Sequence, residues 1–190
     1  MKKVQKGAYG YIDAQRKIET IKTIVLFGLA AAIFLVGYLS TGTKKNLFTV
    51  VAVVSVLPAA KQMATTVLFY RCSSGSKEVF EKISKVSGQV TSVYDLVITS
   101  YDKILEIFHI AIAGKTIIGY SEKEKIDEKF AAYFIKQMLE QNGYKGTSVK
   151  IFKNQETYLA RLEEMQENLG GEEKKELEEA MAGVIKAISI

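Results

Sequence analysis

The hydrophobic pattern divides the chain into two continuous apolar runs near its start and a longer region of mixed character. The runs lie between Thr23 and Tyr70, and a short polar link at residues 40–46 joins them. No charged residue occurs between Thr23 and Thr43, and about 20 apolar residues at the helical rise match a hydrocarbon core of about 30 Å. The pattern therefore predicts a transmembrane hairpin over residues 23–70, with helices at about 23–41 and 47–70.

The second apolar run is interrupted by Pro58, Lys61 and Gln62. Residues 47–60 alone are short for a membrane crossing, so we expect the span to continue to Tyr70, which places Lys61 inside the bilayer. A charge at that depth costs a few kcal/mol on insertion scales. Two interpretations follow: Lys61 and Gln62 form a polar seam at an oligomer interface or pore, or the helix tilts and the Lys61 ammonium extends to the headgroups.

Residues 1–22 carry apolar side chains near helical spacing with basic side chains between them. This segment predicts either an interfacial helix attracted to anionic lipid or a cytosolic tail that leads into the first span. The basic residues expected to face lipid are Lys2, Lys3, Lys6, Arg16, Lys17 and Lys22.

Residues 76–190 alternate between strand-like and helix-like periods. Ser76 is a suitable N-cap for a short helix, and three segments rich in β-branched and aromatic residues then follow with short turns between them, as in consecutive hairpins. The middle strand is apolar on both faces, so we expect it to be central and covered on both sides. The expected strands span 90–99, 104–112, 116–120 and 147–152. The later helices span 122–142 and 154–169, and a last helix after Gly170-Gly171 carries Leu177, Met181, Val184 and Ile188. The prediction is an α+β fold: a two-helix transmembrane hairpin followed by a cytosolic domain of order α-β-β-β-α-β-α-α.

The net charge of +5 is distributed unevenly. Residues 1–22 hold six basic and two acidic residues, whereas residues 76–190 hold 16 basic and 19 acidic residues. Basic residues flank the hairpin on the side of both termini, against two lysines in the link, which predicts a two-pass protein of the plasma membrane with both termini cytoplasmic. Membrane lipid is the expected partner of the basic groups, and a mildly acidic domain disfavours nucleic acid.

The inventory of reactive side chains is small. A single cysteine, Cys72, and a single histidine, His109, provide no cluster of metal ligands, and the phosphate-binding and dinucleotide-binding glycine patterns do not occur. We therefore expect neither a metal nor a cofactor. His109 has no Ser or Cys placed by sequence to make it a general base, so it is interpreted as a structural histidine.

Two acidic residues lie in the expected first hairpin of the sheet. If Thr99 pairs with Ile104, Asp95 lies opposite Phe108 and Glu106 opposite Val97, so both carboxylates project from one otherwise apolar face. Such a pair is costly unless the acids are functional, exposed or paired. Asp95 and Glu106 are thus the candidates for a metal or acid–base site, and the alternative is that they reach water or a lysine.

The order αβββαβ over residues 76–152 resembles the core of restriction-endonuclease-like nucleases. In that family an Asp and an acid-x-Lys triplet on the second and third core strands hold a metal. Glu106 matches the first position, but the next strand, 115–121, contains no carboxylate. The resemblance therefore implies the topology and an inactive catalytic site.

The C-terminal segment 154–179 carries nine acids against three basic residues. This is either the solvated face of helices or a docking surface for a basic partner protein. With no catalytic motif present, the sequence favours a membrane-anchored, non-enzymatic module whose domain binds a partner protein or self-associates. The alternatives are a membrane-tethered nuclease-like hydrolase that uses Asp95 and Glu106, and an oligomeric pore lined by Lys61.

Overall fold

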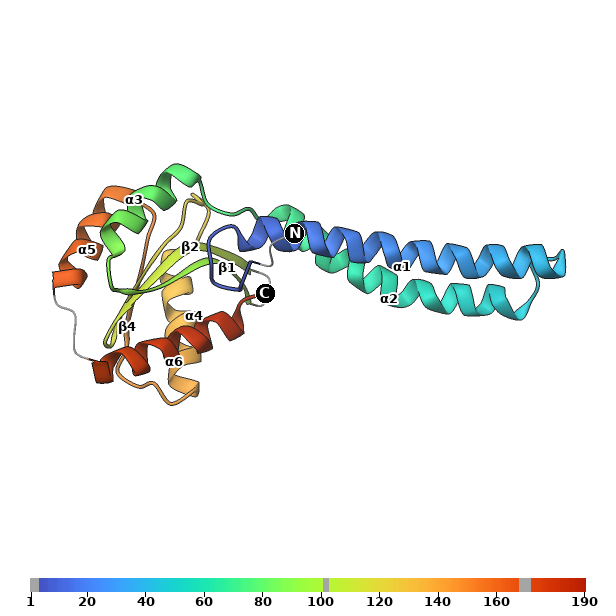
Figure 1. Cartoon of the computed structure of the whole chain (residues 1–190). Helices are drawn as coiled ribbons and strands as arrows, with labels where there is room; N and C mark the ends of the chain where they lie inside the picture. The colour runs from blue at the N-terminus through green and yellow to red at the C-terminus, as the bar shows by residue number, and fades with distance from the viewer. Residues whose placement is uncertain (1–3, 101–102, 168–171) are drawn as a thin grey trace. The chain divides into compact units, whose positions relative to one another are not determined.

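The computed structural model describes residues 4–100, 103–167 and 172–190. The chain forms two compact units, one made of residues 12–73 and the other of residues 1–11 together with 74–190 (Figure 1). The second unit is thus assembled from two separate stretches of sequence.

The first unit is a hairpin of two long helices, α1 (Tyr11–Thr41) and α2 (Leu47–Arg71), as the sequence predicts. Asn46 begins α2 as its N-cap, and its side-chain oxygen accepts a hydrogen bond from the Thr49 amide at 2.9 Å. The helices approach closely at Gly37, where an added Cβ would lie 2.3 Å from Cβ of Phe48. Pro58 is accommodated inside α2. Both helices are long and apolar enough to cross a membrane.

The second unit contains four helices and a four-stranded mixed sheet, so the α+β prediction and the order of its elements are confirmed (Figure 1). Its sheet order is β1-β2-β3-β4; the first three strands form an antiparallel meander, and β4 is parallel to β3. Pairing of Thr99 with Ile104 is also confirmed. The elements are α3 (Lys77–Ser87), β1 (Thr91–Ser100), β2 (Lys103–Ala113), β3 (Thr116–Tyr120), α4 (Glu128–Gln141), β4 (Ser148–Phe152), α5 (Gln155–Glu167) and α6 (Glu172–Ile188).

Helices cover both faces of the sheet. Ile135 of α4 and Ile185 of α6 belong to a buried cluster with Ile110 on one face. On the other face, Ile83 of α3 and Tyr158 of α5 pack with strand residues that include Ala111. The central strand β2 therefore contributes to two cores, as its sequence predicts.

Helix α4 begins later than predicted. The sequence predicts a helix over residues 122–142 that follows Ser121, but the helix begins at Glu128. Asp127 is its N-cap, and its side chain accepts a hydrogen bond from the Phe130 amide at 3.0 Å. The Ser121 hydroxyl instead donates a hydrogen bond to the Glu106 carbonyl at 2.6 Å. Ser121 and Asp127 are both suitable N-cap residues. The helix begins after Asp127, which is closer to the continuous helical pattern.

Residues 5–10 differ most from the prediction, because they do not form a helix with residues 11–22. They fold against the outer edge of β1, where the Gly7 carbonyl accepts from the Tyr94 amide at 2.8 Å. The other chain end covers the same edge: the Ile190 amide donates to the Val97 carbonyl at 2.9 Å. The Lys6 ammonium joins the two ends by donating to the Ser189 carbonyl at 2.5 Å. An otherwise open sheet edge is thus largely closed by the protein's own termini.

Candidate functional site

Asp95 has the most unusual environment of the predicted site residues. Its side chain and backbone are 2% exposed, and its φ of +51° lies in the left-handed region, which Asp tolerates better than most residues. One carboxylate oxygen accepts from the Gly10 amide at 2.6 Å and the other from the Gly75 amide at 3.3 Å. Gly10 lies just before α1 and Gly75 just after α2, so one carboxylate holds the chain at the start and at the return of the hairpin.

The irregular backbone at Asp95 changes which face each neighbouring side chain occupies. The strands pair regularly on either side, Tyr94 with His109 and Leu96 with Ile107. Leu105 and Ile107 nevertheless share a core cluster with Ile110 and Ile112, while Phe108 lies in the opposite cluster. Regular alternation would place Phe108 and Ile110 on one face, but they lie in opposite clusters, because strict alternation fails at this point of the hairpin.

Glu106, the second of the predicted acids, contacts a lysine. Its carboxylate forms an ion pair with Lys123 at 3.2 Å, and its side chain is 19% exposed. Reaching a lysine was one of the two outcomes expected for this residue. Among the residues that the structure describes, no group of three His, Cys, Asp or Glu side chains could hold a metal ion. Lys123 thus holds the Glu106 carboxylate, and the amides of Gly10 and Gly75 hold that of Asp95.

His109 is completely buried in the core. Its Nδ1 atom lies 2.5 Å from the hydroxyl oxygen of Tyr158, and its ring packs 4.3 Å from the ring of Tyr94. Burial lowers the pKa of His109 to about 3 and raises the pKa of Tyr158, so both groups are neutral at pH 7. Nε2 has no hydrogen-bond partner within the described ranges. The arrangement is that of a buried polar pair between sheet and helix.

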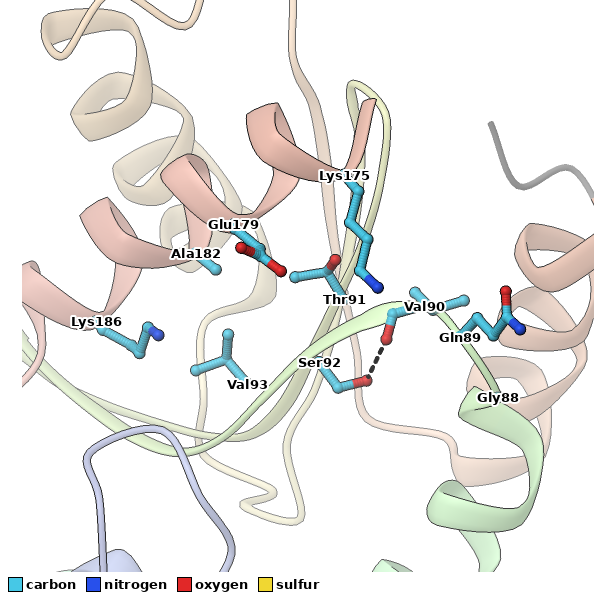
Figure 2. A pocket seen from close by; sticks show the side chains of 10 residues that line it. All are labelled: Gly88, Gln89, Val90, Thr91, Ser92, Val93, Lys175, Glu179, Ala182 and Lys186. Carbon is cyan, nitrogen blue, oxygen red and sulfur yellow. Dashed lines mark hydrogen bonds between the residues drawn. The ribbon is translucent and has the colours of Figure 1, made fainter. Parts of the chain in front are cut away.

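A cleft that the sequence did not reveal lies between the start of β1 and α6 (Figure 2). It has a volume of about 620 Å³, within the usual range for ligand pockets. Lys175 and Lys186 extend from α6 toward the strand, with Glu179 between them. The lining residues are Gly88, Gln89, Val90, Thr91, Ser92, Val93, Lys175, Glu179, Ala182 and Lys186.

The buried carboxylate of Glu178 fixes the walls of this cleft. It accepts from the Thr91 hydroxyl at 3.0 Å and from the Gly114 amide at 2.5 Å, joining α6 to β1 and to the turn after β2. The predicted acidic surface therefore includes one acid that has a structural role. The cleft leaves no local signal in the sequence, because residues that join its walls, such as Thr91 and Glu178, are 87 positions apart in the chain.

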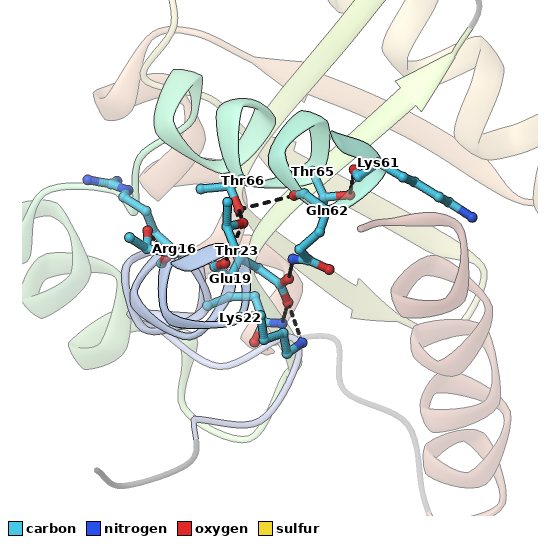
Figure 3. A network of polar contacts seen from close by, with 10 residues as sticks. Arg16, Glu19, Lys22, Thr23, Lys61, Gln62, Thr65 and Thr66 are labelled. Carbon is cyan, nitrogen blue, oxygen red and sulfur yellow. Dashed lines mark hydrogen bonds and ion pairs between the residues drawn. The ribbon is translucent and has the colours of Figure 1, made fainter. Parts of the chain in front are cut away.

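A polar network joins the two helices of the hairpin around Glu19, which is 5% exposed (Figure 3). Its carboxylate accepts hydrogen bonds from Gln62, from Gln15 at 2.6 Å and from Lys22 at 2.8 Å. The hydroxyls of Thr23 and Thr66 lie 2.7 Å apart one turn further along the α1 helix. The sequence did not predict a role for Glu19, because it lies in residues 1–22, which were assigned to a segment before the hairpin.

The predicted seam of Lys61 and Gln62 is divided by this network. Gln62 contacts α1, while the Lys61 side chain is exposed and points away from the Glu19 carboxylate (Figure 3). Because Thr66 contacts both Glu19 and Thr23, Lys61 lies a little more than one turn further along, beside the start of the uncharged part of α1. Met63 to Tyr70 therefore lie beside the charged stretch of α1 rather than beside its apolar stretch.

The basic residues expected to face lipid have different environments. Lys2 and Lys3 lie outside the described residues. Arg16 pairs with Asp13 at 2.7 Å and donates to the carbonyls of Phe69 and Cys72, Lys17 is exposed, and Lys22 pairs with Glu19. Lys6 is bound within the domain, where partial burial lowers its pKa.

Comparison with protein-family models, curated proteins and solved structures finds no match. The order from α3 to β4 is the one on which the nuclease-like resemblance rests, and that resemblance stays a prediction.

Proposed function

We propose that the chain is a two-pass membrane protein whose hairpin anchors the α+β domain at the cytoplasmic face as a protein-binding module. The observation that carries the proposal is the surface of the hairpin. Of the twenty-one large hydrophobic side chains exposed in the described part of the chain, nineteen belong to α1 and α2, including Leu39 at 79% and Leu47 at 76%. An apolar surface of this extent is unfavourable in water and matches lipid.

The pairing of the helices supports a definite depth of insertion. Polar groups gather at the level of Glu19 and Gln62, and Lys44 and Lys45 mark the other end of the hairpin. The uncharged stretches between these ends, residues 23–41 of α1 and 47–60 of α2, are about 28 Å and 21 Å long at the helical rise. Lys61 then lies near the headgroups, where its ammonium requires neither a pore nor a partner.

The orientation rests on the basic residues near both termini, and partner binding rests on the open cleft beside α6. Labelling with a membrane-impermeant thiol reagent tests the topology. In a Cys72→Ser background, a cysteine at Thr43 should react from outside intact cells, and one at Lys145 should react only after the membrane is opened. Labelling of both positions, or of Lys145→Cys alone, in intact cells would contradict the proposal.

A further inference from the structure

We infer that the cleft between β1 and α6 binds an extended, acidic segment of a partner protein, which adds to the free part of the β1 edge. The inference rests on the proposed protein-binding function and identifies the site and the chemistry of the partner. In the described part of the chain, β1 is the last strand of the sheet, and no further strand of the sheet lies on its outer side.

The backbone of Ser92 presents its hydrogen-bonding groups to this cleft. In an antiparallel pair, residues alternate between bonding to the partner strand and pointing away from it. The Tyr94 amide points outward, since it donates to Gly7, and Ser92 is two residues earlier on the same regular stretch. Its amide and carbonyl are therefore directed outward as a donor and acceptor pair for an added strand.

The protein already uses this mode of binding on the same edge. Gly7 accepts from Tyr94, and Ser189 forms an antiparallel bridge with Ile98. Gly7 lies at one end of the cleft, packed against the side chains of Val93 and Lys186. A Cβ atom added to Gly7 would lie 2.9 Å from Val93 and 2.7 Å from Lys186. The segment before Val93 is the part of the edge that the termini leave open, and the cleft lies over it.

The charge of the cleft selects the partner. Lys175 and Lys186 contribute two ammonium groups and Glu179 one carboxylate, and no described carboxylate lies within ion-pairing distance of either lysine (Figure 2). Acidic side chains on an added strand would pair with these lysines. A second copy paired through the same edge would bring lysines against lysines, so charge disfavours self-association at this site.

Binding can be measured with the full chain in detergent micelles and a fluorescent peptide in which valine and glutamate alternate. We expect the peptide to bind, and the Lys175→Ala/Lys186→Ala double variant to weaken it about tenfold, the effect of losing two exposed ion pairs. Lys145→Ala, which removes an exposed lysine far from the cleft in sequence, is the matched control and should leave affinity unchanged. A peptide with lysine in place of glutamate should not bind.

Backbone pairing is tested on the peptide, so the fold of the protein is not disturbed. N-methylation of alternate peptide amides should weaken binding when the methylated edge faces β1, and the Ser92 amide signal should shift on titration with the unmodified peptide. No binding of the valine–glutamate peptide, or binding that N-methylation and the double lysine variant leave unchanged, would overturn the inference. Membrane topology is measured separately by thiol labelling, so anchoring can hold when peptide binding fails, and the reverse.

Discussion

Asp95 shows how a single buried charge can organise distant parts of a chain. Hydrogen bonds from backbone amides can stabilise a buried carboxylate, as those from Gly10 and Gly75 do for Asp95. The left-handed backbone turns the side chain toward the chain segments that lead to α1 and from α2. The cost of burying this acid is therefore offset by fixing both attachment points of the hairpin.

Replacing Asp95 with Ala should destabilise the domain by about 3 kcal/mol, because two charge-assisted hydrogen bonds are lost and Ala is strained at a positive φ. Asp95→Gly loses the same hydrogen bonds without the strain, so it should recover about 1 kcal/mol. Urea unfolding of the full chain in micelles, followed by tyrosine fluorescence, measures both variants. Equal stability of Asp95→Ala and the unmodified protein would show that the carboxylate does not hold these segments.

The unusual environment of Asp95 could be found from sequence, but its partners could not. An acid on an apolar sheet face is visible in the hydrophobic pattern, and the pairing of Thr99 with Ile104 belongs to a register that brings Tyr94 opposite His109 and Leu96 opposite Ile107 on either side of it. Its partners are backbone amides of two glycines, one 85 residues earlier in the chain. Amides leave no signal in a side-chain pattern, so the prediction offered a metal, water or lysine instead.

For the two helices of the hairpin, too, the sequence predicts the elements but not the contacts between them. Their apolar character and the bounds of α2 were correctly expected, but α1 begins at Tyr11 and not near Thr23 as predicted. Their mutual alignment depends on Glu19, Gln62, Thr23 and Thr66, whose pairing requires the helices to be folded. This alignment places Lys61 beside the start of the uncharged part of α1.

Glu19→Ala should loosen the pairing of α1 and α2, because it removes the acceptor for Gln62, Gln15 and Lys22. Interhelical hydrogen bonds in membrane proteins contribute about 0.6 kcal/mol on average, so a loss of about 1 kcal/mol is expected. Thermal unfolding in micelles, followed by circular dichroism, measures it. Lys61→Ala, an exposed change on the neighbouring helix, serves as control; a larger effect of this variant than of Glu19→Ala would contradict the alignment.

At the scale of the molecule, the α+β domain is discontinuous in sequence. Residues 4–11 contribute to its edge and its core through Gly7, Gly10 and the ring of Tyr9, which stacks 4.1 Å from Phe80. The sequence predicted a domain that begins at residue 76, because the hairpin separates the two stretches. Gly10 and Gly75 both bind the carboxylate of Asp95, so the chain returns close to the place where it left.

The hairpin should therefore be replaceable by a short glycine–serine linker that joins Tyr11 to Ser74. We expect this variant to fold as a soluble domain. The two points that the linker joins are already close, because the neighbouring Gly10 and Gly75 amides both donate to the Asp95 carboxylate. A second variant that begins at Ser74 lacks the partners of Tyr94, Asp95 and Phe80, and should be less stable by about 3 kcal/mol, from two hydrogen bonds and one aromatic pair. Urea unfolding compares the two. Equal stability would show that the N-terminal segment lies outside the folded domain, as the sequence alone had suggested.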